Sequence, residues 1–180
     1  SEYWDTANSS LNPHNRGHGF YVYGTLPMFI TRYFVEWIYG HSGFQEMTNV
    51  GRILSALFDL STVFLVYFVA SLLFDRRVGV LASAFSALAV LQIQHAHFFT
   101  MDTFTTFFAL LTIYFATKIS LLAPKDFSGG HLETEGGDII AKFKQFAVHP
   151  YFALCIGFGI ALGMATASKV NAAPLAFLLP

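Results

Sequence analysis

The sequence predicts an all-α protein, a polytopic bundle of transmembrane helices with an extracytoplasmic loop that contains an interfacial helix. Its 180 residues are 54% hydrophobic and 12% charged, whereas soluble domains have about 25% charged residues. Long apolar runs alternate with short polar segments, and about 20 apolar residues suffice for a helix to cross a bilayer. Because a soluble chain of this size has no room to bury so much apolar surface, we expect a membrane protein.

The composition also excludes several classes of protein. The formal net charge of −1 argues against nucleic acid as a partner, because nucleic-acid-binding domains are normally basic. The single cysteine, Cys155, excludes an intrachain disulfide and a cysteine-based metal site. High apolar content with little charge is the opposite of a disordered composition. These exclusions leave a folded membrane protein as the class that the composition supports.

Four apolar runs predict the spanning helices. They cover residues 53–74, 78–94, 98–122 and 151–168. At about 1.5 Å per residue the first reaches roughly 33 Å, enough to cross the hydrocarbon core. In the last run, Gly159 and Gly163 have the small-xxx-small spacing that lets membrane helices approach closely. A fifth apolar run begins after Asn171.

The polar segments divide the chain into four parts. Residues 1–50 are predicted to be an extracytoplasmic loop with an interfacial helix, because the aromatic stretch 21–39 includes Arg32 and Glu36 on one helix face. Residues 51–122 are assigned to three transmembrane helices, 123–150 to a cytoplasmic loop with an amphipathic helix, and 151–180 to the fourth transmembrane helix and the start of a fifth. Since the chain starts without Met and stops inside an apolar run, we expect an internal piece of a longer protein.

Alternation of the spans predicts which segments share a side of the membrane. Basic residues are more frequent on the side of the Arg76–Arg77 turn and of loop 123–150, and this bias points that side to the cytoplasm. Arg52, Asp102 and Lys169 then lie near the same extracytoplasmic surface, although they are far apart in the sequence.

Two basic residues at span ends are candidates for binding a phosphate. Arg52 lies at the mouth of the first span and Lys169 follows the fourth. Either side chain is long enough to snorkel to lipid headgroups, which is the simpler interpretation. The functional interpretation is that the planar fork of Arg52 anchors a donor phosphate and that Lys169 neutralises its charge.

Asp102 is the candidate catalytic residue. It follows His95 and His97 near the start of the third span. One interpretation is a helix N-cap. The other is a carboxylate that faces a polar cavity, where it binds a divalent cation or orients an acceptor hydroxyl. Two histidines at i and i+2 diverge on a helix, which weakens the case for both as metal ligands, and the metal question stays open.

Asp59 lies about two turns inside the first span, on the face of Ser55. A carboxylate at that depth is costly. The sequence allows either a structural hydrogen bond to a neighbouring helix or a place in a polar cavity together with His95 and His97.

Three motifs resemble GT-C glycosyltransferases. They are GRILSAL at the start of the first span, the His-rich segment with Asp102, and GMATASK at the end of the fourth span. More narrowly, the chain resembles the bacterial phospholipid-carrier-dependent glycosyltransferases related to protein O-mannosyltransferases. The segments NPHNRG and FYVYGTLP resemble the first large extracytoplasmic loop of one bacterial branch. The resemblance extends over nearly the whole chain.

The resemblance implies an integral enzyme of the bacterial plasma membrane. Such enzymes transfer a sugar from a polyprenyl-phosphate donor to a protein or lipid hydroxyl on the extracytoplasmic face. By position, Arg52 resembles the phosphate-binding arginine, Asp102 the second-loop acid and Lys169 a further basic residue near the donor. The Asp-Glu pair that the family uses after its first span is absent here, so we expect the general base upstream of residue 1. A divalent cation as cofactor stays open, because metal use varies in the superfamily.

Two other functions remain as alternatives. A segment of a membrane transporter would line a pathway with Asp59 and Asp102. A non-catalytic helical subunit of a membrane complex would use its helices only for packing, and Arg52 and Asp102 would be dispensable.

Overall fold

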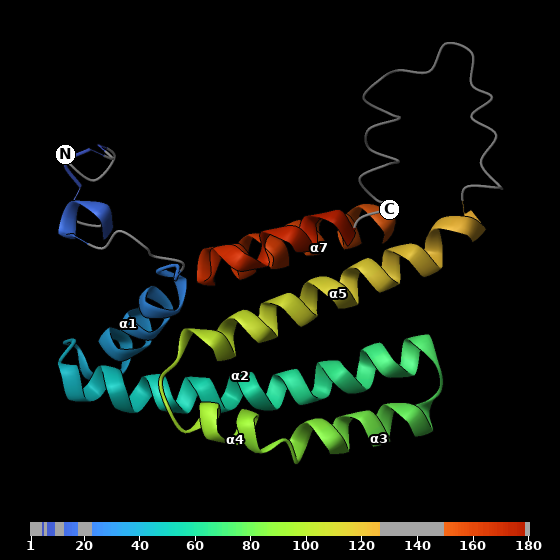
Figure 1. Ribbon diagram of the computed structural model, residues 1–180, viewed down its shortest axis with the longest axis horizontal. Helices are drawn as coiled ribbons and strands as arrows, with labels where there is room; N and C mark the ends of the chain where they lie inside the picture. Colours follow the sequence, from blue (N-terminus) through green and yellow to red (C-terminus); the bar gives the residue numbers. More distant parts are fainter. Residues whose placement is uncertain (1–4, 6, 10–12, 18–22, 127–149, 179–180) are drawn as a thin grey trace, which may run out of the picture.

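The computed structural model describes residues 5, 7–9, 13–17, 23–126 and 150–178, and within them the fold is helical (Figure 1). After a short 3-10 helix, η2 (Pro13–Arg16), six α-helices and a second 3-10 helix follow in the described part. They are α1 (Leu26–Tyr39), α2 (Phe44–Leu73), α3 (Arg76–Ala87), α4 (Val90–Ala96), α5 (Met101–Asp126), α7 (Pro150–Ser168) and η3 (Val170–Leu178). The all-α membrane helix bundle predicted from the sequence is confirmed.

In the part of the chain that the structure describes, two helices are long and apolar enough to cross a membrane, and the bent pair α3 and α4 would make a third if it is one span. The two helices are α2 and the portion of α5 from Met101 to Leu122, and they agree with the predicted spans at 53–74 and 98–122. Helix α2 begins at Phe44, earlier than predicted. The apolar run marks only the part of the helix that can face lipid, and the first turns of α2 are helical but polar. The 30 residues of α2 correspond to about 45 Å, so one end of α2 projects beyond the hydrocarbon core.

The region predicted as one uninterrupted second span, 78–94, is broken. Helices α3 and α4 meet at a bend of 59°, where Ala89 is extended and starts the new helix. The Ser86 hydroxyl donates a hydrogen bond to the Gln92 side-chain oxygen across the bend, at 3.0 Å. Neither proline nor glycine stands at residues 85–94, so composition gave no sign of the break.

Helix α7 occupies the residues of the predicted fourth span, 151–168, but its apolar part, Phe152–Ser168, is shorter than the two helices above, so its crossing of the membrane stays a prediction. The predicted fifth apolar run forms η3, a 3-10 helix with Pro174 inside it. This helix packs back against α7 and α5. The predicted amphipathic helix of loop 123–150 lies largely at 127–149, outside the described residues, so that prediction stays untested.

Helix α5 lies between α2 and α7 (Figure 1) and contacts both extensively. Its Phe104 and Phe108 are buried against Leu54 of α2 and Ala165 of α7. The ring of Phe58 packs on Phe104 with centroids 4.5 Å apart. This aromatic core fixes the start of α5 relative to the N-terminal part of α2 and the C-terminal end of α7.

The glycines of α7 pack differently from the prediction. A Cβ at Gly159 or Gly163 would meet nothing within 4 Å, whereas one at Gly157 would approach the Phe115 ring to 2.7 Å. The close contact between α5 and α7 is therefore made at Gly157. Gly159 and Gly163 lie on a different face of α7 from Gly157. That face points away from the described helices, since nothing lies near either glycine.

Helix α1 confirms the helical part of the prediction for 21–39. Arg32 and Glu36 form an ion pair at 2.8 Å, as their spacing predicted. Thr31 and Val35 are buried against the bundle, whereas Trp37 is 80% exposed. An exposed aromatic side beside an ion pair is typical of a membrane–water interface, but the position of α1 at a membrane surface stays a prediction.

Candidate functional site at one end of the bundle

The start of α5 and the end of α7 are joined by an ion pair. The Lys169 Nζ donates a hydrogen bond to Asp102 Oδ1 at 2.6 Å. The Lys169 side chain is 23% exposed and the Asp102 side chain 42%, so the pair sits at the edge of the bundle. Hydrogen bonding to Asp102 raises the pKa of Lys169 above its ordinary value, although partial burial acts in the opposite direction.

Asp102 is not the N-cap of α5, because the helix begins at Met101 and Asp102 belongs to its first turn. A carboxylate there is stabilised by the positive end of the helix dipole. The Thr100 hydroxyl, one residue before the helix, is 3.1 Å from the Thr103 hydroxyl. The carboxylate of Asp102 is thus left to face outward from the helix start, toward Lys169.

The segment before α1 also contacts Lys169. Its ammonium lies 5.1 Å from the centre of the Tyr23 ring, a cation–π geometry. The Gly24 amide donates a hydrogen bond to the Ser168 carbonyl at 2.9 Å. A Cβ at Gly24 would overlap the Ala167 carbonyl oxygen, so only glycine permits this approach. Three distant segments therefore meet at Lys169.

Arg52 holds the connection between α4 and α5. Its Nε donates a hydrogen bond to the His97 carbonyl at 2.8 Å, and its side chain is otherwise exposed. The His97 ring turns back to the Ile93 carbonyl, 2.7 Å away. Arg52 and the Asp102–Lys169 pair are thus at the same end of the bundle.

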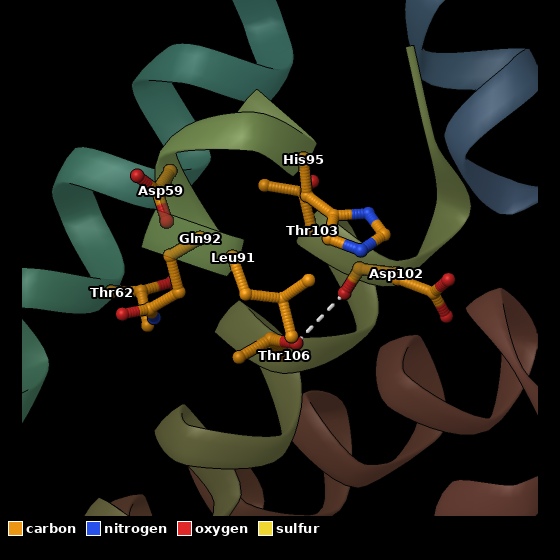
Figure 2. A pocket seen from close by; sticks show the side chains of 8 residues that line it. All are labelled: Asp59, Thr62, Leu91, Gln92, His95, Asp102, Thr103 and Thr106. Atoms are coloured by element: carbon orange, nitrogen blue, oxygen red, sulfur yellow. Dashed lines mark hydrogen bonds between the residues drawn. The ribbon is translucent and has the colours of Figure 1, made fainter. Parts of the chain in front are cut away.

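A cavity of about 220 Å³ lies between α2, α4 and the first turns of α5. Seven of its eight lining residues have polar side chains, although carbon atoms make up more of its surface than polar atoms do; the eight are Asp59, Thr62, Leu91, Gln92, His95, Asp102, Thr103 and Thr106. Figure 2 shows Asp59, Thr62 and Gln92 on one side of this space and His95 and Asp102 on the other. We call it the polar cavity. The bend between α3 and α4 places the side chains of α4 over it.

A second hollow of about 530 Å³ follows α5 toward its middle. It shares Asp102 and Thr106 with the polar cavity, and Lys169 and Asn171 complete its polar end. Farther along, its lining is apolar and comes from Ala109, Leu110, Ile113, Ala172 and Leu175. We call it the groove. Arg52 lines neither of these two spaces.

Of the residues proposed from the sequence, the structure joins Asp102 with Lys169, and it places Asp59 and His95 beside Asp102 in one cavity. His97 does not line that cavity, and its ring contacts the Ile93 carbonyl instead. Among the described residues no group of three or more His, Cys, Asp or Glu side chains is arranged to hold a metal ion. Sequence reasoning did not select Tyr23, Gln92 or Asn171, because their contribution depends on tertiary contacts.

A comparison with known protein families gives a match over residues 29–123 to the family described as dolichyl-phosphate-mannose-protein mannosyltransferase. The chain belongs to this family. The mannosyltransferase-family match includes Arg52, Asp59, His95 and Asp102, whereas Lys169 lies beyond it. No curated protein and no solved structure matches the chain.

Membership of the mannosyltransferase family makes the protein an integral-membrane glycosyltransferase of the GT-C type. The resemblance to GT-C mannosyltransferases is thereby confirmed, whereas the narrower resemblance to a bacterial branch stays a prediction, because its motifs in the first loop lie outside the match, as does the motif at the end of the fourth span. It also favours the transferase over the transporter segment and the non-catalytic subunit. The family match covers most of α1, all of α2, α3 and α4, and most of α5. It therefore includes the three helices that line the polar cavity, α2, α4 and α5.

Proposed function

We propose that the protein transfers a sugar from a polyprenyl-phosphate donor to a protein or lipid hydroxyl on the extracytoplasmic side of the membrane. The observation that supports this most is the groove, which has a cation at one end and apolar side chains along the rest. A lipid-linked phosphate sugar has the same division, an anionic head and a hydrocarbon chain.

The groove follows from the register of α5. Asp102, Thr106 and Ile113 recur at helical spacing on one face, so the lining changes from polar to apolar along the helix. The apolar side chains of η3 form the opposite wall. An isoprenoid chain would bury apolar surface there at about 25 cal/mol per Å².

The phosphate would bind near Lys169, whose ammonium is already fixed by Asp102 and by the Tyr23 ring. A phosphate near the hydrocarbon boundary needs such a partner, because an uncompensated charge there costs several kcal/mol. Arg52 would approach it from the α4–α5 connection, since only its Nε is engaged with His97. The remaining guanidinium N–H groups are suited to phosphate oxygens.

Asp102 is proposed to orient the acceptor hydroxyl. Its Oδ1 accepts from Lys169, and it borders both the groove and the polar cavity. A carboxylate between a cationic head-group site and a polar space is placed to hold a hydroxyl near the sugar carbon. As a hydrogen-bond acceptor it would direct the oxygen lone pair of that hydroxyl toward the donor.

The test is donor binding by the protein in native-like membranes. Lys169→Met is expected to weaken binding of a short-chain polyprenyl phosphate by about tenfold or more, whereas Lys169→Arg retains most of it. Arg77→Met, at the other end of the bundle, is the control for loss of a positive charge. If wild-type protein does not bind the polyprenyl phosphate, or Lys169→Met binds it as wild type does, the proposed donor site is wrong.

A further inference from the structure

The polar cavity contains side chains whose hydrogen-bonding groups have no partner in the described part of the chain. Asp59 has neither a hydrogen bond nor an ion pair there, the His95 ring has none, and Gln92 uses only its side-chain oxygen, which accepts from Ser86. Asp59 is a carboxylate inside a membrane-spanning helix, where an unpaired charge is expensive. Polar side chains that line a cavity and lack a protein partner are expected to form hydrogen bonds with a bound ligand.

The composition of the lining excludes an anionic ligand. Asp59 presents a carboxylate to the cavity, and neither lysine nor arginine is among the lining residues. Asp102 also lines the cavity, but its carboxylate points away from it, toward Lys169 (Figure 2). A phosphate in the cavity would be repelled by the Asp59 carboxylate and would find no cation there. The described residues also lack a group arranged to hold a metal ion, so a cation is not the occupant that the lining fits.

A neutral polyol fits the same lining. Hydroxyl groups donate hydrogen bonds to carboxylates and accept them from the Gln92 amide and the His95 ring. The threonine hydroxyls of Thr62 and Thr106 are already engaged with main-chain carbonyls, so they contribute mainly as acceptors. The volume of about 220 Å³ is far above the roughly 10–15 Å³ that one water molecule requires, and Leu91 supplies an apolar surface against which the carbon side of a sugar ring could pack.

The relation between the two spaces indicates how such a ring is presented. The polar cavity and the groove share Asp102 and Thr106. The cation, Lys169, lies on the groove side of Asp102, and the unpaired carboxylate, Asp59, lies on the cavity side. A glycosyl phosphate has the same polarity, with the anion at one end and the hydroxyl groups at the other.

We propose that the polar cavity binds the glycosyl ring of the donor, with Asp59, Gln92 and His95 as the residues that recognise its hydroxyl groups. This inference rests on the proposed function, because it assumes that the donor phosphate binds beside Lys169. It adds a specificity site between α2 and α4 that is separate from the phosphate site.

The test compares a short-chain polyprenyl phosphate with the same carrier bearing mannose, each as a ligand of the purified protein in nanodiscs. Asp59→Asn keeps the shape of the side chain and removes its charge. It is expected to weaken binding of the mannosylated carrier by about tenfold and to leave binding of the bare carrier phosphate unchanged. His95→Leu is a second variant with the same expected pattern. Lys169→Met is expected to weaken both ligands.

Asp75→Asn is the matched control, because this carboxylate caps α3 by accepting the Val78 amide at the opposite end of the bundle. It should bind both ligands as wild type does. The site is overturned if Asp59→Asn and His95→Leu bind the mannosylated carrier like wild type, or if they weaken the two carriers equally. If the wild-type protein binds neither carrier, the proposed donor site is wrong, and the inference that rests on it is wrong as well. A wild type that binds both carriers equally shows that the ring makes no contact and also overturns the inference.

Discussion

At the scale of single residues, Lys169 has more interactions than its position in the sequence indicates. As a lone charge after an apolar run it was expected to bind or neutralise a phosphate. The structure shows it as the meeting point of the Asp102 carboxylate, the Tyr23 ring and the Ser168–Gly24 bridge. The span alternation predicted that Asp102 and Lys169 lie near the same surface of the membrane. Their direct hydrogen bond depends on side-chain geometry, which no sequence pattern contains.

The pair should have a defined pH dependence. The folded-state pKa of Lys169 is raised above 10.5, chiefly by its hydrogen bond to Asp102. A lysine with a raised pKa stabilises the fold fully below the unfolded value and loses that contribution as the pH rises through the folded value. The difference in melting temperature between wild type and Lys169→Met should therefore be constant from about pH 7 to 9 and shrink above about pH 10.5.

That measurement uses thermal unfolding in detergent, with Lys118→Met as the control. Lys118 lies over the Tyr114 ring at 5.5 Å and belongs to α5, away from the Asp102 pair. A difference between wild type and Lys169→Met that shrinks already between pH 7 and 9 would show that the ammonium is not stabilised as described.

Arg52 provides a second prediction at this scale. Arg52→Lys keeps the charge but removes the planar fork that bonds the His97 carbonyl and, as proposed, the donor phosphate. Sugar-transfer activity in membranes should fall about tenfold or more. Arg76→Lys, at the start of α3 and the opposite end of the bundle, is the control and should be unaffected. Full activity of Arg52→Lys would mean that a point charge at this position is sufficient.

At the scale of helices, sequence reasoning located most elements and misplaced their ends. Apolar runs identified α2, α5 and α7 because hydropathy reports the need to face lipid. It does not report where hydrogen bonding of the helix stops, so the start of α2 at Phe44 was missed. The bend at Ala89 was missed for a related reason, because the run 78–94 contains no charged residue and neither glycine nor proline stands near the bend, at residues 85–94.

The packing of α7 against α5 is tested by three glycines. Gly157→Ala should lower the free energy of unfolding by about 1–3 kcal/mol, because its new methyl group would press on the Phe115 ring. Gly159→Ala and Gly163→Ala should be neutral or stabilise by up to about 1 kcal/mol, because the space beside them is open and alanine favours helix. Thermal unfolding in one detergent compares all three. The reverse order of stabilities would restore the small-xxx-small pair as the interface.

At the scale of the whole molecule, the helices place two kinds of residue at opposite ends. Arg52, Asp102 and Lys169 gather at one end, while the Arg76–Arg77 turn joins α2 and α3 at the other (Figure 1). The span alternation inferred from the sequence had predicted this separation. It does not identify the side of the membrane, because that depends on the distribution of basic residues in loops.

Cysteine labelling in intact cells tests the orientation. In a Cys155→Ala background, which leaves no other cysteine in this chain, Ser42→Cys in the exposed α1–α2 connection should react with a membrane-impermeant maleimide. Ser128→Cys should react only after the membrane is permeabilised. The opposite pattern would place the polar cavity and the groove on the cytoplasmic side and contradict the proposed sidedness.

The ion pair between the start of α5 and the end of α7 also bears on the order in which the protein is made. Asp102 leaves the ribosome 67 residues before Lys169, so α5 enters the membrane while its carboxylate still lacks its partner cation. The three-way junction at Lys169 forms only when α7 has been inserted and the segment at Tyr23 and Gly24 has returned to meet it. Among the described helices, the end of the bundle that holds the site is therefore completed later than the opposite end, where α2 and α3 are joined. Nascent chains stalled before Lys169 would have an open groove and a carboxylate without its cation, and these features would mark them for membrane quality-control proteases until the junction has formed.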